Sequence, residues 1–462
     1  MKPFAIRGFN PCESLLRHTP EQLRTFLRRM KTLNMNTIII HYDYGWKRYQ
    51  NLILEECDRN KIEIILMTFG PRTFLSYSDW KPVWFAKNAD GIPFTNRLEC
   101  ETFPCRFNPE CLEAYEYGAK QWLKSLPPQI RHVHMRAADG LMFCQCEKCR
   151  MLPEQERWQP FVELFTKAVL ETCPEIRFET DVYVKRYNIP QNHKPFEQMT
   201  DIMYDTFYHS PQHPLISGTD FYTANTVQYA ASESNPDAKT AGLYHLNRLR
   251  EWCREFPEKV YIHENAMAQG LCGTFQFGTE TYLKDLDLFR KLGVQGVCYE
   301  AYEPGYSNFE QMFELLAKSM NGEEVEYTPS EMELSAKQNS IWFDTDPNFP
   351  LEKYISDPFT LKQHQLYRPI WTGGGLREMR NYLEFMLENK DRLDYLFTGY
   401  FIFQQVGLHG KKMKFRNLTE QENDFLHRRK LWDFMEDIPT SEDPRKICLN
   451  IIQSMLAKAE EV

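Results

Sequence analysis

The chain has 462 residues, of which 42% are hydrophobic and 26% charged, a composition typical of a globular protein with one large domain and a smaller one. Its formal net charge of −9 argues against a nucleic-acid-binding surface, and no apolar run approaches the length of a membrane span. The N-terminal segment lacks the apolar core of a signal peptide, and the 13 cysteines are too scattered for a disulfide framework. We therefore expect a cytoplasmic protein.

Strand-like and helix-like segments alternate through about the first 320 residues. The predicted strands are short apolar segments: Phe4–Gly8, Thr37–Tyr44, Glu63–Gly70, His132–Met135, Arg177–Val184, Asp201–Tyr208, Lys259–Glu264 and Gly296–Ala301. Amphipathic helices are expected between them, as in Pro20–Leu33. This alternation predicts a (β/α)8 TIM barrel over residues 1–322. A doubly wound open sheet is the alternative, but no glycine-rich phosphate loop follows the first strand.

The pattern changes after residue 322. Residues 323–360 begin acidic and polar, as expected of a linker. Residues 361–462 have apolar residues at spacings of three and four, which predicts an α-helical domain beginning with a helix over Leu376–Asn389.

Polar side chains lie at or just after the C-terminal ends of the predicted strands, where (β/α)8 barrels carry their active sites. Hydrolysis of a glycosidic bond needs two carboxyl groups, one protonated and one ionised. The fourth and seventh strands lie across a barrel from each other, so Asp139 and Glu264 are the first choice for the catalytic pair, with Glu300 in reserve. For any one of these residues, capping a helix or pairing with an arginine is the alternative.

Other strand-end residues are candidates for substrate binding. The predicted set comprises Asn10, Asp43, Tyr44, Arg136, Tyr183, Asp205 and Tyr302. The tyrosines would stack on sugar faces, although simple packing in the core is the alternative. The histidines at positions 41, 134 and 263 alternate with apolar residues on strands and are expected to be buried and hydrogen-bonded.

Cys144, Cys146 and Cys149 follow the fourth strand with the spacing C-x-C-x-x-C. Three thiols this close can bind one soft cation, and a fourth ligand would complete a closed tetrahedral zinc site that is structural. Cys105 is the first choice for that ligand because neighbouring barrel loops adjoin; Cys100 and Cys111 are alternatives. Three reduced thiols without a metal are the other possibility.

The run from Asp139-Gly140 to Cys149, with Cys105-Arg-Phe-Asn-Pro-Glu110 upstream, resembles glycoside hydrolase family 163 and its relatives. The resemblance implies a barrel fold and hydrolysis of glycosides, since characterised members are endo-β-N-acetylglucosaminidases acting on N-glycans. This chain has Ala138 where relatives often have a polar residue before the acid, and we expect it to have no export signal. We carry over the reaction class, for an N-acetylhexosaminide or uronide, and not the substrate.

Three functions follow from these patterns. The first is a glycoside hydrolase with an oligosaccharide or glycoside substrate. The second is a catalytically inactive barrel that binds carbohydrate. The third is a metal-dependent hydrolase or lyase that uses histidine and aspartate at the barrel mouth.

Overall fold

The computed structural model describes residues 1–11, 15, 20–75, 81, 83–93, 104–137, 143–183, 186–206, 209, 214–217, 241–264, 278–300, 310–329, 362, 365–366 and 376–389. Eight parallel strands form a closed barrel in chain order, and the last strand pairs with the first. The strands are β1 (Ile6–Asn10), β2 (Thr37–His41), β3 (Glu63–Phe69), β4 (His132–Arg136), β5 (Arg177–Val182), β6 (Ile202–Asp205), β7 (Val260–Glu264) and β8 (Gly296–Glu300). The predicted (β/α)8 barrel is confirmed.

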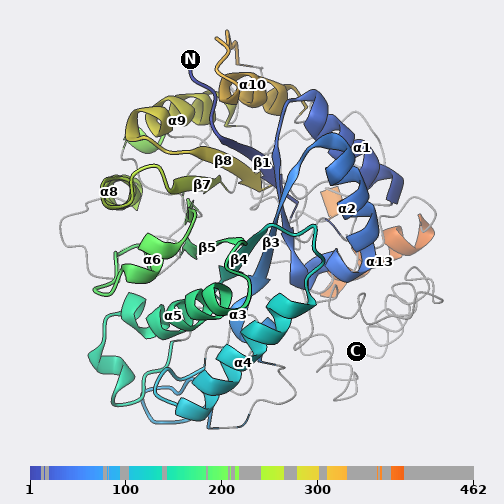
Figure 1. Ribbon diagram of the computed structural model, residues 1–462. Coiled ribbons are helices and arrows are strands. Elements are labelled where there is room, and N and C mark those ends of the chain that lie inside the picture. The colour runs from blue at the N-terminus through green and yellow to red at the C-terminus, as the bar shows by residue number, and fades with distance from the viewer. Residues whose placement is uncertain are drawn as a thin grey trace.

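Helices surround the barrel on all sides (Figure 1). They are α1 (Pro20–Thr32), α2 (Lys47–Asn60), α3 (Gly70–Phe74), α4 (Pro109–Ser125), α5 (Glu154–Thr172), α6 (Lys194–Gln198), α8 (Ala241–Glu255), α9 (Thr279–Leu292) and α10 (Glu310–Met320). Their apolar faces pack on the outward side chains of the strands, as Leu27 and Met30 of α1 do in the same buried cluster as Ile38 and Ile40 of β2. Burial of this layer supplies the main driving force for folding.

The interior of the barrel is only partly apolar. A small buried cluster fills part of it, comprising Ile6, Ile39, Ile65, Met67, Met203, Tyr261 and Cys298. Polar side chains occupy other inward positions, as the hydrogen bond from Tyr261 to Glu179 across the interior shows. Since barrel interiors are usually filled by branched apolar residues, the polar layers require a separate explanation.

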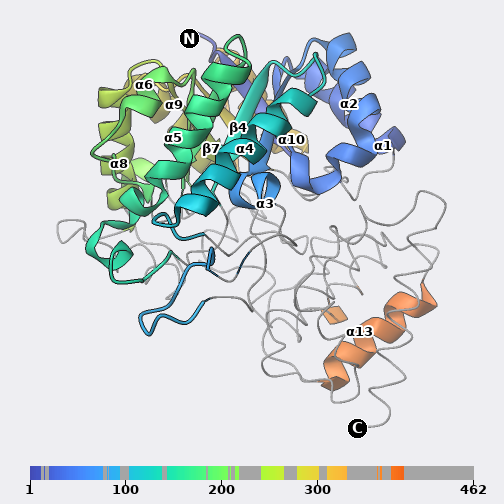
Figure 2. The same ribbon diagram turned by 60° about the horizontal axis from the view of Figure 1, so that its bottom comes forward.

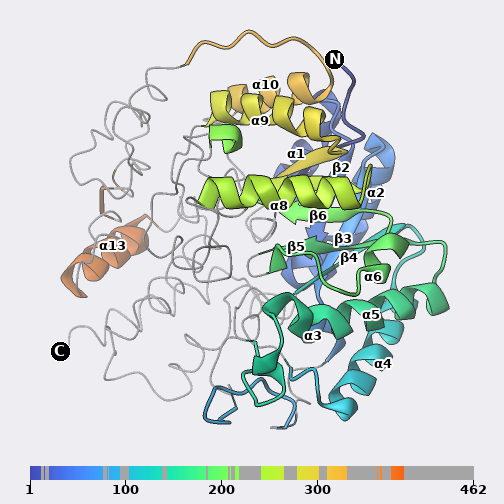
Figure 3. The same ribbon diagram turned by 90° about the vertical axis from the view of Figure 1, so that its left-hand side faces the viewer.

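The N-terminus lies against the end of the barrel repeat. The amino group of Met1 donates to the carbonyl of Gly322 at 2.7 Å, and the amide of Phe4 donates to the carbonyl of Met320 at 3.0 Å. Figures 1 and 3 show this end of the chain beside α10. The residues just before β1 are therefore hydrogen-bonded to the end of α10 and to the turn that follows it.

The second strand is shorter than predicted. It ends at His41, and residues Tyr42–Trp46 form one wide helical turn that leads into α2. Gly45 has a φ of +84°, which is favourable only for glycine, and this allows the sharp entry into the helix.

Helix α13 (Leu376–Glu388) confirms the helix predicted at the start of the C-terminal region. It lies apart from the helices that surround the barrel (Figures 2 and 3). The other helices predicted there, and most of the linker, fall outside the described residues, so the domain boundaries at 322 and 361 stay predictions. No helix within the described ranges is both long and apolar enough to cross a bilayer.

Candidate active site

Alternation along the strands decides which side chains enter the barrel. On β7, Tyr261 belongs to the interior cluster, so His263 also faces inward, whereas Ile262 faces the helices. The same rule brings the last inward residue of most strands to one end of the barrel. We call this polar set the mouth; it comprises Asn10, His41, Arg136, Asp181, Asp205, His263 and Glu300.

Asp205 at the end of β6 is the centre of the mouth. One of its oxygens, Oδ2, lies 2.9 Å from Nδ1 of His263 and accepts a hydrogen bond from Nη2 of Arg136 at 3.2 Å. All three side chains are buried. A carboxylate that is removed from water needs such partners, and here they come from β4 and β7.

Arg136 is held by three groups. Besides Asp205, its Nε lies 3.3 Å from Oδ2 of Asp181, and its guanidinium stacks 4.1 Å from the ring centre of Tyr183. Arg186 donates to the other oxygen of Asp181 at 3.0 Å. Burial alone would raise the pKa of Asp181, but the charges of Arg186 and Arg136 outweigh it, so the pKa lies below its ordinary value.

Asn10 connects the first two strands to this network. Its Nδ2 lies 2.8 Å from Nε2 of His263 and 3.4 Å from Nε2 of His41. On the other side, Oε2 of Glu300 lies 3.8 Å from Nε2 of His263. The mouth thus forms one connected polar set, in which the predicted binding residues Asn10, Arg136 and Asp205 meet the predicted acid Glu300.

Glu264 lies on the opposite face of β7 from His263. Its Oε2 accepts a hydrogen bond from Thr206 at 2.8 Å and lies 3.0 Å from Nδ1 of His209. The other ring nitrogen of His209 lies 3.1 Å from Asp285 on α9. Glu264 therefore belongs to a buried polar cluster between the barrel and the helices, and this does not fit the expectation that it faces the mouth.

The remaining predicted site residues are only partly described. Asp139 and Tyr302 fall outside the described residues. Asp43 and Tyr44 lie in the turn after β2, and their side chains are not among those described. Asp139 follows Arg136 by three positions, which keeps it close in sequence to the end of β4.

A second polar cluster lies deeper in the barrel and was not predicted as a unit. Glu179 of β5 lies 2.7 Å from Nδ1 of His134 and 3.0 Å from Nε2 of His132, and accepts a hydrogen bond from Tyr261 at 2.6 Å. His132, Glu179 and Asp201 also have donor atoms close enough together to hold a metal ion. Because Arg177 donates to Asp201 at 2.7 Å and His132 pairs with Glu179, we interpret this cluster as a buried ion-pair network.

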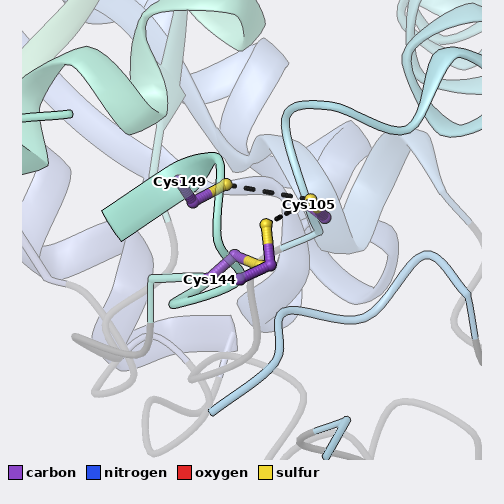
Figure 4. Close-up of side chains that lie close together, drawn as sticks. Cys105, Cys144 and Cys149 are labelled. Atoms are coloured by element: carbon purple, nitrogen blue, oxygen red, sulfur yellow. Dashed lines mark hydrogen bonds between the residues drawn. The ribbon is translucent and has the colours of Figure 1, made fainter. Parts of the chain in front are cut away.

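The four predicted thiols come together in the loops after β3 and β4. The sulfurs of Cys105, Cys144, Cys146 and Cys149 all lie within 4.8 Å of one another. Sγ of Cys105 lies 3.8 Å from that of Cys149 (Figure 4). It lies 3.9 Å from Sγ of Cys146. Hydrogen bonds from Cys105 and Cys149 lower the pKa of the Cys144 thiol, as expected where neighbouring thiols favour one thiolate.

Backbone hydrogen bonds fasten the two loops to each other. The amide of Lys87 donates to Sγ of Cys144 at 3.4 Å, and its carbonyl accepts from the amide of Gln145 at 2.7 Å. Within the loop after β3, the amide of Cys105 donates to the carbonyl of Trp84 at 2.8 Å. The cluster therefore joins the loop after β3 to the loop that contains Asp139.

Comparison with known proteins gives a likeness of fold. No family model and no curated protein matches the chain. Similar solved structures include a β-galactosidase from the psychrophilic Marinomonas ef1, with 10% identity and a TM-score of 0.45, covering 72% of this chain and 60% of that one. Gan42B, a β-galactosidase from G. stearothermophilus, has 12% identity and a TM-score of 0.46, and the match covers 80% of this chain and 64% of that one.

The PgaB (BpsB) glycoside hydrolase domain from Bordetella bronchiseptica is also similar, with 9% identity and a TM-score of 0.44, covering 69% of this chain and 100% of that domain. The chain spans less than two thirds of either β-galactosidase. At these identities the likeness concerns the barrel architecture alone, and the resemblance to glycoside hydrolase family 163 stays a prediction.

Proposed function

We propose that the protein is a glycoside hydrolase whose active site is the mouth of the barrel. The observation that carries this proposal is the connected set of buried charged side chains at the C-terminal strand ends, with the Glu300 carboxylate beside the pair formed by Asp205 and His263. Such a set costs free energy when it is removed from water, and barrel closure does not require it. Titratable groups arranged in this way are typical of active sites.

Glu300 is our choice for the ionised carboxylate. It ends β8, faces inward, and lies in the mouth with 4% of its surface exposed. In a closed barrel of eight strands, β8 lies directly opposite β4, after which Asp139 follows. We therefore propose Asp139 as the second carboxyl group, acting as acid/base or orienting a substrate acetamide. The proposed pair is therefore Asp139 and Glu300, in place of the pair Asp139 and Glu264 expected from the sequence.

An N-acetylhexosaminide fits the mouth better than a uronide. Among the described residues of this region, the guanidinium of Arg136 is already paired with Asp181 and Asp205, and that of Arg186 with Asp181. A uronate would add another negative charge beside Glu300, and like charges in one site repel. Asn10 and the ring of Tyr183 are then proposed to contact the sugar hydroxyls and one sugar face.

Turnover of 4-nitrophenyl glycosides by matched variants tests the proposal. The panel contains the β-N-acetylglucosaminide, β-galactoside and β-glucuronide. Glu300→Gln is expected to reduce kcat by about 10³-fold or more while the fold, measured by circular dichroism, is kept. Glu264→Gln makes the same chemical change on the other side of the barrel wall and is expected to retain far more activity.

If Glu300→Gln keeps parental turnover, Glu300 is not the catalytic carboxylate. If calorimetry instead shows that the parent binds a sugar without hydrolysing it, the catalytically inactive carbohydrate-binding barrel is favoured.

We also propose that the four thiols bind a structural zinc ion. Zinc–sulfur bonds of about 2.3 Å in a tetrahedron give sulfur–sulfur edges of about 3.8 Å. The two described sulfur distances from Cys105 are 3.8 and 3.9 Å, so the donor set already has the size of the ion's ligand shell. Four thiolates leave no open position, so this metal would hold the loops after β3 and β4 rather than act on substrate.

A further inference from the structure

His263 lies between carboxylates of the two strands that flank its own strand, β7. Its Nδ1 lies 2.9 Å from Oδ2 of Asp205 on β6, and its Nε2 lies 3.8 Å from Oε2 of Glu300 on β8. The side chain is fully buried. The first contact is a hydrogen bond, whereas the second is too long for one and acts through charge.

Other strands contribute the remaining polar groups around this imidazole. Asn10 of β1 contacts Nε2, and His41 of β2 contacts the same amide. Arg136 of β4 shares Asp205 with His263, and Asp181 of β5 balances part of the arginine charge. The amide of Asn10 can present either its oxygen or its NH2 group, so it suits both protonation states of the ring.

The surroundings favour the imidazolium form. Burial alone would lower the pKa of His263, and Arg136 also lowers it, but the charge and hydrogen bond of Asp205 and the charge of Glu300 outweigh both, so the pKa is raised. The raised pKa thus favours a positive charge on the ring, which lies between the carboxylates of Asp205 and Glu300. By the same interaction, a positive ring favours the ionised form of any carboxyl group beside it.

We infer that His263 is a positioning residue, which is fixed by Asp205 and keeps Glu300 in its carboxylate form for attack or base catalysis. This inference rests on the proposed function for its role in catalysis, but the coupling between His263 and Glu300 belongs to the protein whether or not it turns over a substrate. Glu300 would touch the substrate, and His263 would act through Glu300.

NMR of the imidazole nitrogens measures this coupling without any substrate. In protein labelled with 15N-histidine, the signals of His263 are identified among the 12 histidines by their loss in His263→Gln. We expect a titration midpoint above the ordinary 6.5, and a fall of about one pH unit in Glu300→Gln. Glu264→Gln, which alters the outward neighbour on β7, is expected to leave the midpoint unchanged. Equal midpoints in the parent and in Glu300→Gln would overturn the inference.

Two further measurements complete the test. Asp205→Asn is expected to lower the His263 midpoint as well, and it serves in place of Glu300→Gln if that variant does not fold. With an active parent, His263→Gln should move the acidic limb of kcat/KM to higher pH by about one unit, because Glu300 loses the charge that favours its ionisation. An unmoved limb contradicts the positioning role, and absence of activity in the parent counts against the proposed function while the NMR result still stands.

Discussion

The sulfur atoms of Cys105 and Cys149 lie 3.8 Å apart, although the two residues are 44 positions apart in the chain. This distance suits a hydrogen bond between two thiols, and it also matches one edge of a tetrahedral zinc–thiolate site, which is about 3.8 Å long. Cys105, Cys144 and Cys149 are buried, and Cys146 is partly exposed. The metal, if bound, would be nearly closed off from solvent.

The first prediction is that the purified protein contains about one zinc ion per chain, measured by inductively coupled plasma mass spectrometry. Cys149→Ser should lose this metal, because three thiolates bind zinc more weakly than four, and its unfolding midpoint should fall. Cys57→Ser changes a buried thiol on α2, outside the cluster, and should keep the metal. A parent without metal, whose stability a chelator leaves unchanged, would contradict the zinc proposal.

The second prediction concerns the cluster behind β7. Glu264→Gln keeps a group that can accept from Thr206 but removes the charge that faces His209, so the free energy of unfolding should fall by about 1–3 kcal/mol. Urea denaturation measures this value. Glu175→Gln, which changes an exposed glutamate, should have almost no effect. Equal stabilities of the two variants would mean that the Glu264 contacts do not stabilise the fold.

The barrel and four of the seven residues of the mouth could be predicted from the sequence, for a clear reason. Strand ends follow from hydrophobic pattern, and in a parallel barrel all C-terminal ends meet on one side, so Asn10, Arg136, Asp205 and Glu300 could be placed together. The side of β7 on which the Glu264 side chain lies could not be predicted. Both sides of such a strand are buried, so alternation of polar and apolar residues does not say which side is inside.

The deeper network was missed for a related reason. Glu179 occupies the middle of β5, where the pattern predicts an apolar side chain, and its partners His132 and His134 lie on another strand. An acid in the middle of a predicted strand is the available signal, but the residues that it pairs with depend on the register of the barrel strands. The distances between the thiols of the two loops after β3 and β4 depend on the same register. Here the sequence-based choice of Cys105 agrees with the structure, which places its sulfur beside the other three.

The third prediction is that Arg136→Met strongly destabilises the protein. Arg136 balances Asp181 and Asp205 in a buried site, and its loss leaves both carboxylates with one cationic partner each, Arg186 and His263. Removing one partner from a buried ion pair typically costs about 3–5 kcal/mol. Arg136→Lys keeps the charge but not the planar fork that reaches both acids, so an intermediate loss is expected in urea denaturation. A loss below about 1 kcal/mol for Arg136→Met would show that the mouth tolerates the unbalanced acids.

The fourth prediction is a loss of stability above neutral pH that depends on His132. Burial lowers the pKa of this histidine. The charge of Glu179 and hydrogen bonds to Glu179 and Glu63 raise the pKa by more than burial lowers it, to about 9. A pKa that is raised on folding stabilises the protein fully below the unfolded value of 6.5, and this contribution disappears as the pH rises through about 9.

Between pH 7 and pH 10 the contribution of His132 should therefore fall by about 2.5 kcal/mol, from the difference between the folded and unfolded pKa values. Urea denaturation of the parent and of His132→Gln at several pH values isolates it, because titration of other groups is common to both proteins. The stability of the parent should decline more steeply above pH 7 than that of the variant, and the gap between them should narrow toward pH 10. Parallel curves would mean that His132 does not become charged on folding, and that Glu179 depends on His134 and Tyr261 alone.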